Sequence, residues 1–317
     1  MRAEHTSTVA TPLGTGLDYF DLNFLGHPEV IATGLLTGRD GVALVDPGPS
    51  TTLGTLKQEL ASRGIALADV RSVLITHIHL DHAGATGSLV ADCPNATVYV
   101  HERGAPHLAD PSKLISSASR LYGADMERLW GEILPVPAGR IKSLSAADST
   151  RLTVAGHNVD VTATPGHASH HVSYFLGDAG IAFVGDTAGL CRASGRIVLP
   201  ATPPPDIDLP AWRKSAEKIL AWNPEVLFLT HFGPHRSPRV HFADFWKRLE
   251  GWNRRVWGDI QKSDSDGDLE RRFADDVTEE LARETSRIEA QAYAVAGRFD
   301  YSWRGLARYW RKVNPAT

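Results

Sequence analysis

The stretch Thr76-His77-Ile78-His79-Leu80-Asp81-His82-Ala83-Gly84 holds three histidines and an aspartate within six residues. It follows Val73-Leu74-Ile75, an apolar run that predicts a buried strand. A strand end is a rigid platform, and the loop after it can turn several side chains inward. Neutral imidazole nitrogens and carboxylate oxygens are ligands for zinc, iron and manganese. The stretch therefore predicts a metal site at the end of this strand.

Three more residues of ligand type follow apolar runs farther along the chain. His167 comes after Thr162-Ala163-Thr164, Asp186 after Phe183-Val184, and His231 after Phe228-Leu229-Thr230. Each of these runs predicts a strand that delivers one ligand-type side chain at its carboxyl end. The convergence of four strand ends on one edge is stronger evidence for a metal site than any single motif.

The first two-thirds of the chain predicts alternating strands and helices. Short apolar runs between turn signals predict strands at residues 42–45, 73–76, 97–100, 159–163, 172–176, 181–184 and 226–229. Leucines at three- and four-residue spacing predict a helix over residues 51–63, and a second helix is expected over 210–222. This alternation favours an α/β fold in which sheets are covered by helices.

Two segments depart from that alternation. Residues 104–134 are helical in pattern and are interpreted as an insertion within a catalytic domain of residues 1–239. Residues 240–317 form a helical C-terminal region that we expect either to roof a pocket or to pair two chains in a homodimer. Two apolar stripes are expected there: Phe245, Leu249, Trp252, Val256 and Ile260, and then Leu281, Ile288, Ala292 and Val295.

Composition limits the partners that can be expected. The 317 residues carry a formal net charge of -4, so no basic field is available for nucleic acid or an anionic membrane. No stretch is long and apolar enough to span a bilayer. Only two cysteines occur, which does not indicate a disulfide framework and makes a cytoplasmic location the expectation. The expected partner is a small-molecule substrate.

These motifs together resemble the metallo-β-lactamase superfamily. The stretch 76–84 is similar to its signature, and Asp46-Pro47-Gly48, Thr164-Pro165-Gly166-His167, Gly185-Asp186-Thr187 and Thr230-His231-Phe232-Gly233 match its other motifs in order. The resemblance covers roughly residues 15–240. It implies an αββα sandwich with two divalent metal ions. The expected metal is zinc, and manganese or iron is the alternative.

The resemblance also implies a role for each residue of the site. One metal would be held by His77, His79 and His167, and the second by Asp81, His82 and His231. Asp186 would bridge the two metals, and Asp46 would orient the histidine loop through hydrogen bonds. Asp81 and Asp186 are the residues expected to take part directly in catalysis.

The implied activity is hydrolysis of a carboxylic thioester or ester by a metal-bridging hydroxide. The sequence is closest in character to the glyoxalase II-like branch. A lactonase is an alternative, although the tyrosine that such enzymes carry soon after the bridging aspartate is absent between Asp186 and Trp212. The motifs are also compatible with a mono-iron persulfide dioxygenase of the same fold, and with a non-enzymatic protein that holds a structural metal.

Candidate substrate-binding residues are Tyr122 and Trp130 on the inserted segment and His235 at the mouth of the cleft. His170 and His171 lie close to His167 in the sequence. We interpret them as surface polar groups at the start of the next strand rather than as parts of the site.

Overall fold

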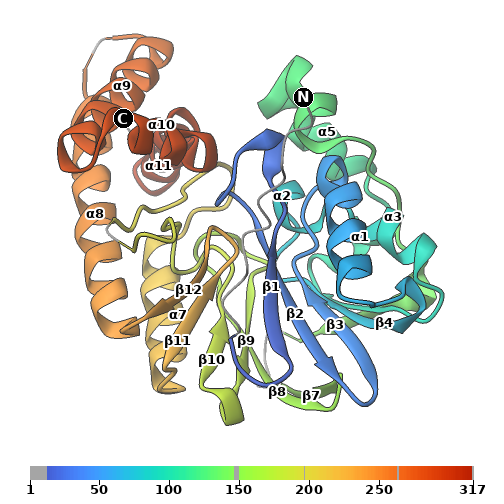
Figure 1. Ribbon diagram of the computed structural model, residues 1–317. Helices are drawn as coiled ribbons and strands as arrows, with labels where there is room; N and C mark the ends of the chain where they lie inside the picture. Colours follow the sequence, from blue (N-terminus) through green and yellow to red (C-terminus); the bar gives the residue numbers. More distant parts are fainter. Residues whose placement is uncertain (1–12, 146–149, 196, 263, 316–317) are drawn as a thin grey trace, which may run out of the picture.

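The computed structural model describes residues 13–145, 150–195, 197–262 and 264–315, and two six-stranded sheets form its centre (Figure 1). The first sheet has the order β1-β2-β3-β4-β5-β6, with strands Leu17–Asp21, Ala32–Gly38, Gly41–Val45, Val70–Leu74, Thr97–His101 and Ile141–Leu144. The second has the order β12-β11-β10-β9-β8-β7, with strands Gly233–Arg236, Val226–Leu229, Ile181–Phe183, Val172–Leu176, His157–Ala163 and Thr150–Val154.

The two sheets pack face to face through a shared apolar layer. Val45 and Leu74 of the first sheet belong to the same core cluster as Phe183 and Phe228 of the second. Tyr174 of β9 crosses this layer, and its hydroxyl donates a hydrogen bond of 2.8 Å to the carbonyl of Ile75. The sheets are thus fixed to each other next to the end of β4, where the histidine-rich stretch begins.

Helices cover the outer face of each sheet. On the first sheet these are α1 (Leu53–Ser62) and α3 (Thr86–Asp92), whose buried leucines pack with strand residues such as Val73. On the second sheet they are α7 (Leu209–Ala221) and α8 (Pro238–Asp259), which bury Trp212 and Phe245. The order helix, sheet, sheet, helix confirms the predicted αββα sandwich.

Two groups of helices lie at one end of the sandwich. Residues between β5 and β6 form α4 (Ala105–Ala109), α5 (Ser112–Tyr122) and α6 (Met126–Trp130), in agreement with the helical pattern of 104–134. The chain ends in α9 (Asp266–Glu284), α10 (Arg287–Gly297) and α11 (Phe299–Val313). Figure 1 shows α10 and α11 at the same end of the molecule as α5.

The structure confirms one C-terminal stripe and corrects the other. Phe245, Leu249, Trp252 and Val256 are buried along α8, whereas Ile288 is 81% exposed. The second stripe fails because it spans two helices: α9 ends at Glu284, and Ser286 starts α10 by accepting a hydrogen bond from the Glu289 backbone N–H. The periodicity of one helix does not continue into the next.

The structure contains the strands predicted at residues 42–45, 97–100, 159–163, 172–176, 181–184 and 226–229. The strand predicted at 73–76 ends two residues early, at Leu74. The backbone N–H of Thr76 leaves the sheet ladder and donates to the side chain of Asp46 at 2.8 Å. This departure begins the turn that carries His77 and His79 inward.

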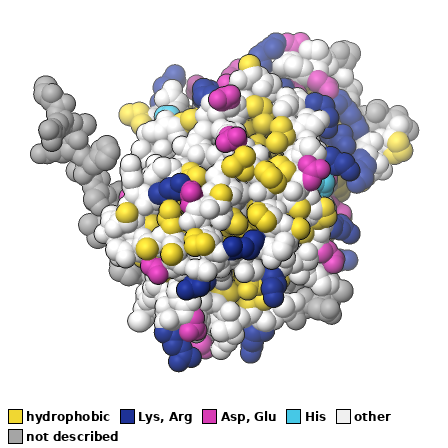
Figure 2. Space-filling view, turned by 90° about the vertical axis from the view of Figure 1, so that its right-hand side faces the viewer, with side chains coloured by type: hydrophobic (Ala, Val, Ile, Leu, Met, Phe, Trp, Pro, Cys, Tyr) yellow, Lys and Arg dark blue, Asp and Glu magenta, His cyan; other side chains and the backbone are white. Residues whose placement is uncertain are grey.

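The surface of the molecule is mixed in character. Figure 2, which views the right-hand side of Figure 1, shows acidic and basic side chains interspersed with apolar ones on that face. No helix in the described residues is long and apolar enough to cross a membrane. Cys93 and Cys191 are both buried and free.

Candidate metal centre

All seven residues predicted to bind metal come together where the loops after four strands meet. His77 and His79 lie in the turn after β4, and Asp81 and His82 lie in the short helix α2 (Leu80–Ala83). His167 follows β8, Asp186 follows β10 and His231 follows β11. Three sets of these side chains have ligand atoms within 4.8 Å of one another: His77/His79/His167, His77/His82/Asp186 and Asp81/His82/His231.

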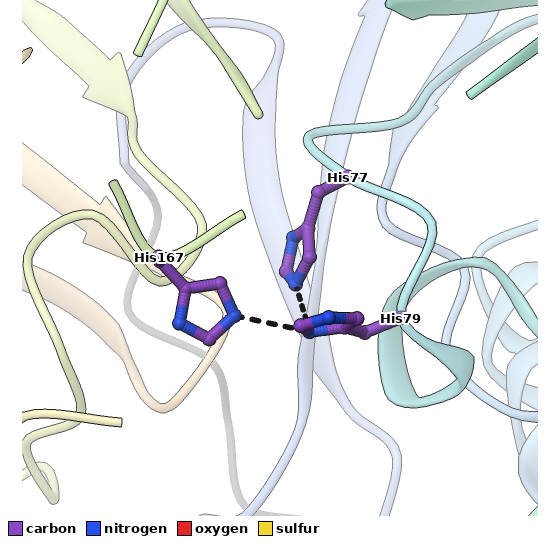
Figure 3. A group of neighbouring side chains, drawn as sticks. All are labelled: His77, His79 and His167. Atoms are coloured by element: carbon purple, nitrogen blue, oxygen red, sulfur yellow. Dashed lines mark hydrogen bonds between the residues drawn. The ribbon is translucent and has the colours of Figure 1, made fainter. Parts of the chain in front are cut away.

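The first set is a triangle of imidazole nitrogens (Figure 3). His77 Nε2 lies 2.9 Å from His79 Nδ1, and His167 Nε2 lies 3.0 Å from the same atom. Tetrahedral zinc with Zn–N distances of about 2.0–2.1 Å places its ligand nitrogens roughly 3.3 Å apart. The triangle therefore has nearly the size that one cation requires.

The second set combines imidazole with carboxylate. His231 Nε2 lies 3.3 Å from Asp81 Oδ2, and His82 Nε2 lies 3.7 Å from the same oxygen. Asp186 faces both sets at once, because its Oδ2 is 3.3 Å from His167 Nε2 and its Oδ1 is 3.2 Å from His82 Nε2. The two oxygens of Asp186 thus point toward different groups of histidines.

The ring nitrogens that face away from the centre are held by acceptors. His167 Nδ1 lies 2.8 Å from the Ala201 carbonyl, and His231 Nδ1 lies 2.6 Å from the Val30 carbonyl. Because a carbonyl can only accept, each ring donates from Nδ1 and keeps the lone pair of Nε2 directed at the centre.

Asp46 holds the loops of both sheets together beneath the centre. The residue has no exposed surface, and its Oδ1 accepts the Thr76 backbone N–H. Its Oδ2 accepts from Thr76 Oγ1 at 2.7 Å, from His82 Nδ1 at 2.8 Å and from Thr230 Oγ1 at 2.7 Å. The predicted orienting role of Asp46 agrees with these contacts.

The donor set fits divalent cations. His82 Nε2 and Asp186 Oδ1 are buried and have no hydrogen-bond partner within the described part of the chain, an arrangement that is costly unless an ion satisfies both. Burial, reinforced by neighbouring histidines, lowers the pKa of His77 well below its ordinary value, so the ring is neutral and able to bind metal. Burial would also lower the pKa of His82, but Asp186, Asp81 and Asp46 raise it well above the ordinary value. This excess of negative charge is the environment that a cation neutralises.

The interpretation as a surface group is wrong for His171, whereas the neighbouring His170 is half-buried. His171 has no exposed surface, and its Nε2 accepts the backbone N–H of Asp186 at 3.3 Å, while its Nδ1 lies 2.9 Å from Thr164 Oγ1. It is therefore a buried support for the loop of Asp186. The sequence signal was its place between two buried strands, where a polar side chain needs partners on both sides.

A cavity of about 80 Å³ opens directly onto the centre. Its lining includes His79, Asp81, Asp186 and His231 together with the two aromatic candidates Tyr122 and Trp130. Arg298 and Tyr301 of the C-terminal helices also line it; no sequence signal pointed to them because they are about 70 residues beyond the last motif. The inserted and C-terminal segments thus meet over the centre, where Tyr301 Oη donates a hydrogen bond of 3.1 Å to the Leu121 carbonyl.

The structure corrects the expectation for His235. The side chain is buried, and its Nε2 lies 3.0 Å from the Cys191 carbonyl and 3.1 Å from the Phe232 carbonyl. It is absent from the lining of the cavity at the centre within the described residues. Two backbone acceptors turn the ring into the protein, so a role in substrate binding is not supported.

The sequence model of the Metallo-beta-lactamase superfamily matches residues 28–231, the span that holds every residue of the centre. The chain belongs to the metallo-β-lactamase superfamily. The fold therefore implies binding of divalent metal, and the chain is a member of a superfamily of metallo-hydrolases.

Relatives within the superfamily are distant. A metallo-beta-lactamase fold-containing protein of Sulfurisphaera tokodaii is 26% identical over 216 residues, which cover 67% of this chain and 76% of that protein. A hydroxyacylglutathione hydrolase of a Synechococcus species is 29% identical over 151 residues, which cover 47% of this chain and 45% of that protein. A solved metallo-beta-lactamase family protein of Thermus thermophilus superposes with a TM-score of 0.70 at 22% identity, over 95% of each chain. That similarity extends the shared fold to nearly the whole chain.

Proposed function

We propose that the protein is a binuclear metallohydrolase that cleaves a carboxylic thioester or ester of a small molecule. The observation that carries the proposal is the position of Asp186, whose two carboxylate oxygens face His167 on one side and His82 on the other. A carboxylate placed in this way suits two cations rather than one.

In this proposal the chain's own residues divide the work. His77, His79 and His167 would hold one cation, and Asp81, His82 and His231 would hold the second. Asp186 would serve both, because its two oxygens face both groups of histidines. Bound there, the two cations would make water more acidic and polarise a substrate carbonyl. Aromatic and aliphatic side chains such as Trp130 and Ile31 wall the cavity beside these residues.

Asp81 is the carboxylate best placed to orient the attacking water. Its side chain is 25% exposed and lines the cavity, whereas the side chain of Asp186 is only 4% exposed. Burial raises the pKa of Asp81, but the facing His82 and His231 outweigh it and bring the pKa to about 2. The ionised Asp81 is therefore a hydrogen-bond acceptor at neutral pH, and it aligns a water O–H toward itself and a lone pair toward the substrate.

The choice of thioester and ester substrates rests on two supports. Relatives named hydroxyacylglutathione hydrolase match 47% of this chain at 29% identity. The centre also leaves space for an acyl group beside its carboxylates, in a cavity walled by Phe24, Ile31 and Leu129.

Two measurements test the proposal. The first is metal content per chain, by elemental mass spectrometry on protein purified without added metal, and the second is turnover of thioesters, esters and lactones. About two zinc, manganese or mixed ions, with hydrolysis lost on chelation, supports it. One iron per chain with oxygen consumption in the presence of a persulfide would replace the hydrolase by a dioxygenase.

A further inference from the structure

A second and larger cavity extends from the centre past Tyr122. It has a volume of about 350 Å³, against about 80 Å³ for the cavity at the centre. The two cavities share His79, Tyr122 and Pro203 in their linings. A molecule whose reacting carbonyl lies at the centre can therefore extend one arm past Tyr122 into the larger space.

The walls of the larger cavity are apolar near the centre. Ile78 and Leu80 contribute from the metal-binding turn, and Leu114, Ala118 and Leu121 contribute from α5. A volume of this size is within the range that buries most of a small organic ligand. These side chains suit a hydrocarbon segment of the arm.

The same cavity carries two cations without partners. Arg103 and Lys113 line it and are exposed, and neither side chain forms an ion pair within the residues that the structure describes. The carboxylate in the lining, Asp206, already accepts a hydrogen bond of 2.6 Å from Ser169 Oγ. An anion at the end of the arm would find two free positive charges.

We propose that the substrate is an ester or thioester with a longer arm that runs past Tyr122 and ends in an anionic group bound by Arg103 and Lys113. This inference rests on the proposed hydrolase function and adds the class of substrate. It assigns the selection of substrate by charge and length to the inserted segment together with Arg103, which directly precedes it, while the chemistry stays with the metal ligands.

The test compares thioesters that differ only in the end of one arm. Butyryl thioesters of 3-mercaptopropionate, 6-mercaptohexanoate and 11-mercaptoundecanoate are matched with the corresponding terminal amides. A second series places the carboxylate or amide on the acyl arm and keeps a methylthio leaving group. The variant Arg103→Gln/Lys113→Gln removes both cations, and the control Arg120→Gln/Lys142→Gln removes two exposed cations that are outside both cavity linings.

In at least one series we expect kcat/KM to favour the carboxylate over the amide by about fivefold to tenfold at one arm length, since each exposed ion pair contributes a factor of a few. The preference should disappear in Arg103→Gln/Lys113→Gln and persist in the control variant. Equal kcat/KM for carboxylate and amide at every length, or a preference that survives loss of both cations, overturns the inference while leaving the hydrolase standing.

Binding measured without turnover separates the two proposals. Calorimetric titration of the metal-loaded protein with 6-hydroxyhexanoate and 6-hydroxyhexanamide should show tighter binding of the carboxylate, and that difference should be lost in Arg103→Gln/Lys113→Gln alone. If no thioester is cleaved but this difference is present, the proposed function fails and the anion site stands. If the difference is absent, the anion site fails whatever the activity.

Discussion

The carboxylate of Asp46 and the imidazole of His82 are joined by a hydrogen bond of 2.8 Å between two side chains with no exposed surface. The bond fixes Nδ1 of His82 as a donor and leaves Nε2 directed at Asp186, 3.2 Å away. A residue that touches neither substrate nor metal thus determines which nitrogen of His82 is offered as a ligand.

Replacing Asp46 by Asn should weaken metal binding without unfolding the protein. Asp46 has φ 52°, a left-handed conformation that Asn tolerates as well as Asp, so the substitution keeps the backbone and replaces one acceptor oxygen by an NH2 donor. We expect metal affinity to fall roughly 10- to 100-fold, measured by competition with a chromophoric chelator. Thr230→Val removes one of the four donors to Asp46 and should have a smaller effect; an equal loss in both variants would contradict the special role of the His82 bond.

Replacing Asp186 by Ala should remove the contact between the two halves of the centre. We expect fewer than two metals per chain and a fall in kcat/KM of at least about a hundredfold, because no other carboxylate in the described part of the chain faces both histidine sets. Circular dichroism should show that the fold is retained. Asp178→Ala, outside the centre, is the control, and full activity in Asp186→Ala would refute the binuclear assignment.

Metal removal should lower the thermal midpoint. A ligand that binds only the folded state stabilises it by about 2.7 kcal/mol when free at 100 times its Kd, and chelation removes this contribution. Differential scanning fluorimetry with and without chelator should show a shift of several degrees that zinc or manganese reverses. The shift should be smaller in Asp186→Ala, and an equal shift in both proteins would place the stabilising metal elsewhere.

Replacing Gly166 by Ala should destabilise the loop that carries His167. Gly166 has φ +145°, and an added Cβ would lie 2.3 Å from both Cα and Cβ of Trp212. We expect a loss of roughly 1–3 kcal/mol in the free energy of unfolding in urea. Gly54→Ala in α1, where an added Cβ meets nothing within 4 Å, is the matched control and should be neutral or stabilising by up to about 1 kcal/mol.

His241 should make stability depend on pH. Burial lowers the pKa of His241 to about 4, although Nε2 donates a hydrogen bond of 2.8 Å to the Ala188 carbonyl. The unfolded chain, with a histidine pKa near 6.5, takes up a proton that the folded chain does not, so this stability is complete above about pH 6.5 and is lost as pH falls through about 4. In metal-free protein, His241→Gln should reduce the difference in unfolding free energy between pH 7 and 4.5 by roughly 2–3 kcal/mol; His27→Gln, at an exposed position, should leave it unchanged.

The sequence was most informative where buried strands precede polar ligands. The runs ending near Thr76, Thr164, Val184 and Thr230 predicted both strands and site, because a hydrophobic run followed by a ligand-type residue carries the signal locally. It missed β1, β6, β7 and β12, the edge strands of the two sheets, where partly exposed strands have weak patterns. It also missed β2, a buried strand whose apolar pattern is interrupted by Thr33 and Gly34. It also missed His171, because whether a histidine is buried depends on what packs against it from other parts of the chain.

The candidate substrate residues show the same limit. Tyr122 and Trp130 line the cavity at the centre, where the amphipathic insertion packs, and their role in substrate binding stays a prediction. The expectation that His235 lies at the cleft mouth was wrong, because its two carbonyl acceptors come from turns whose geometry no motif encodes. Tyr301 reaches the cavity only through the packing of α11, which sequence spacing does not specify. The predicted homodimer and the cytoplasmic location stay predictions.

The hydrogen bond from Thr230 to Asp46 joins residues 184 positions apart, and the centre needs His231 as its final ligand. During synthesis, the histidines of the first sheet therefore leave the ribosome well before the loop that completes their site. Until then His77, His79 and His82 make up only part of the ligand set. Completion of the site is thus coupled to the docking of the second sheet onto the first.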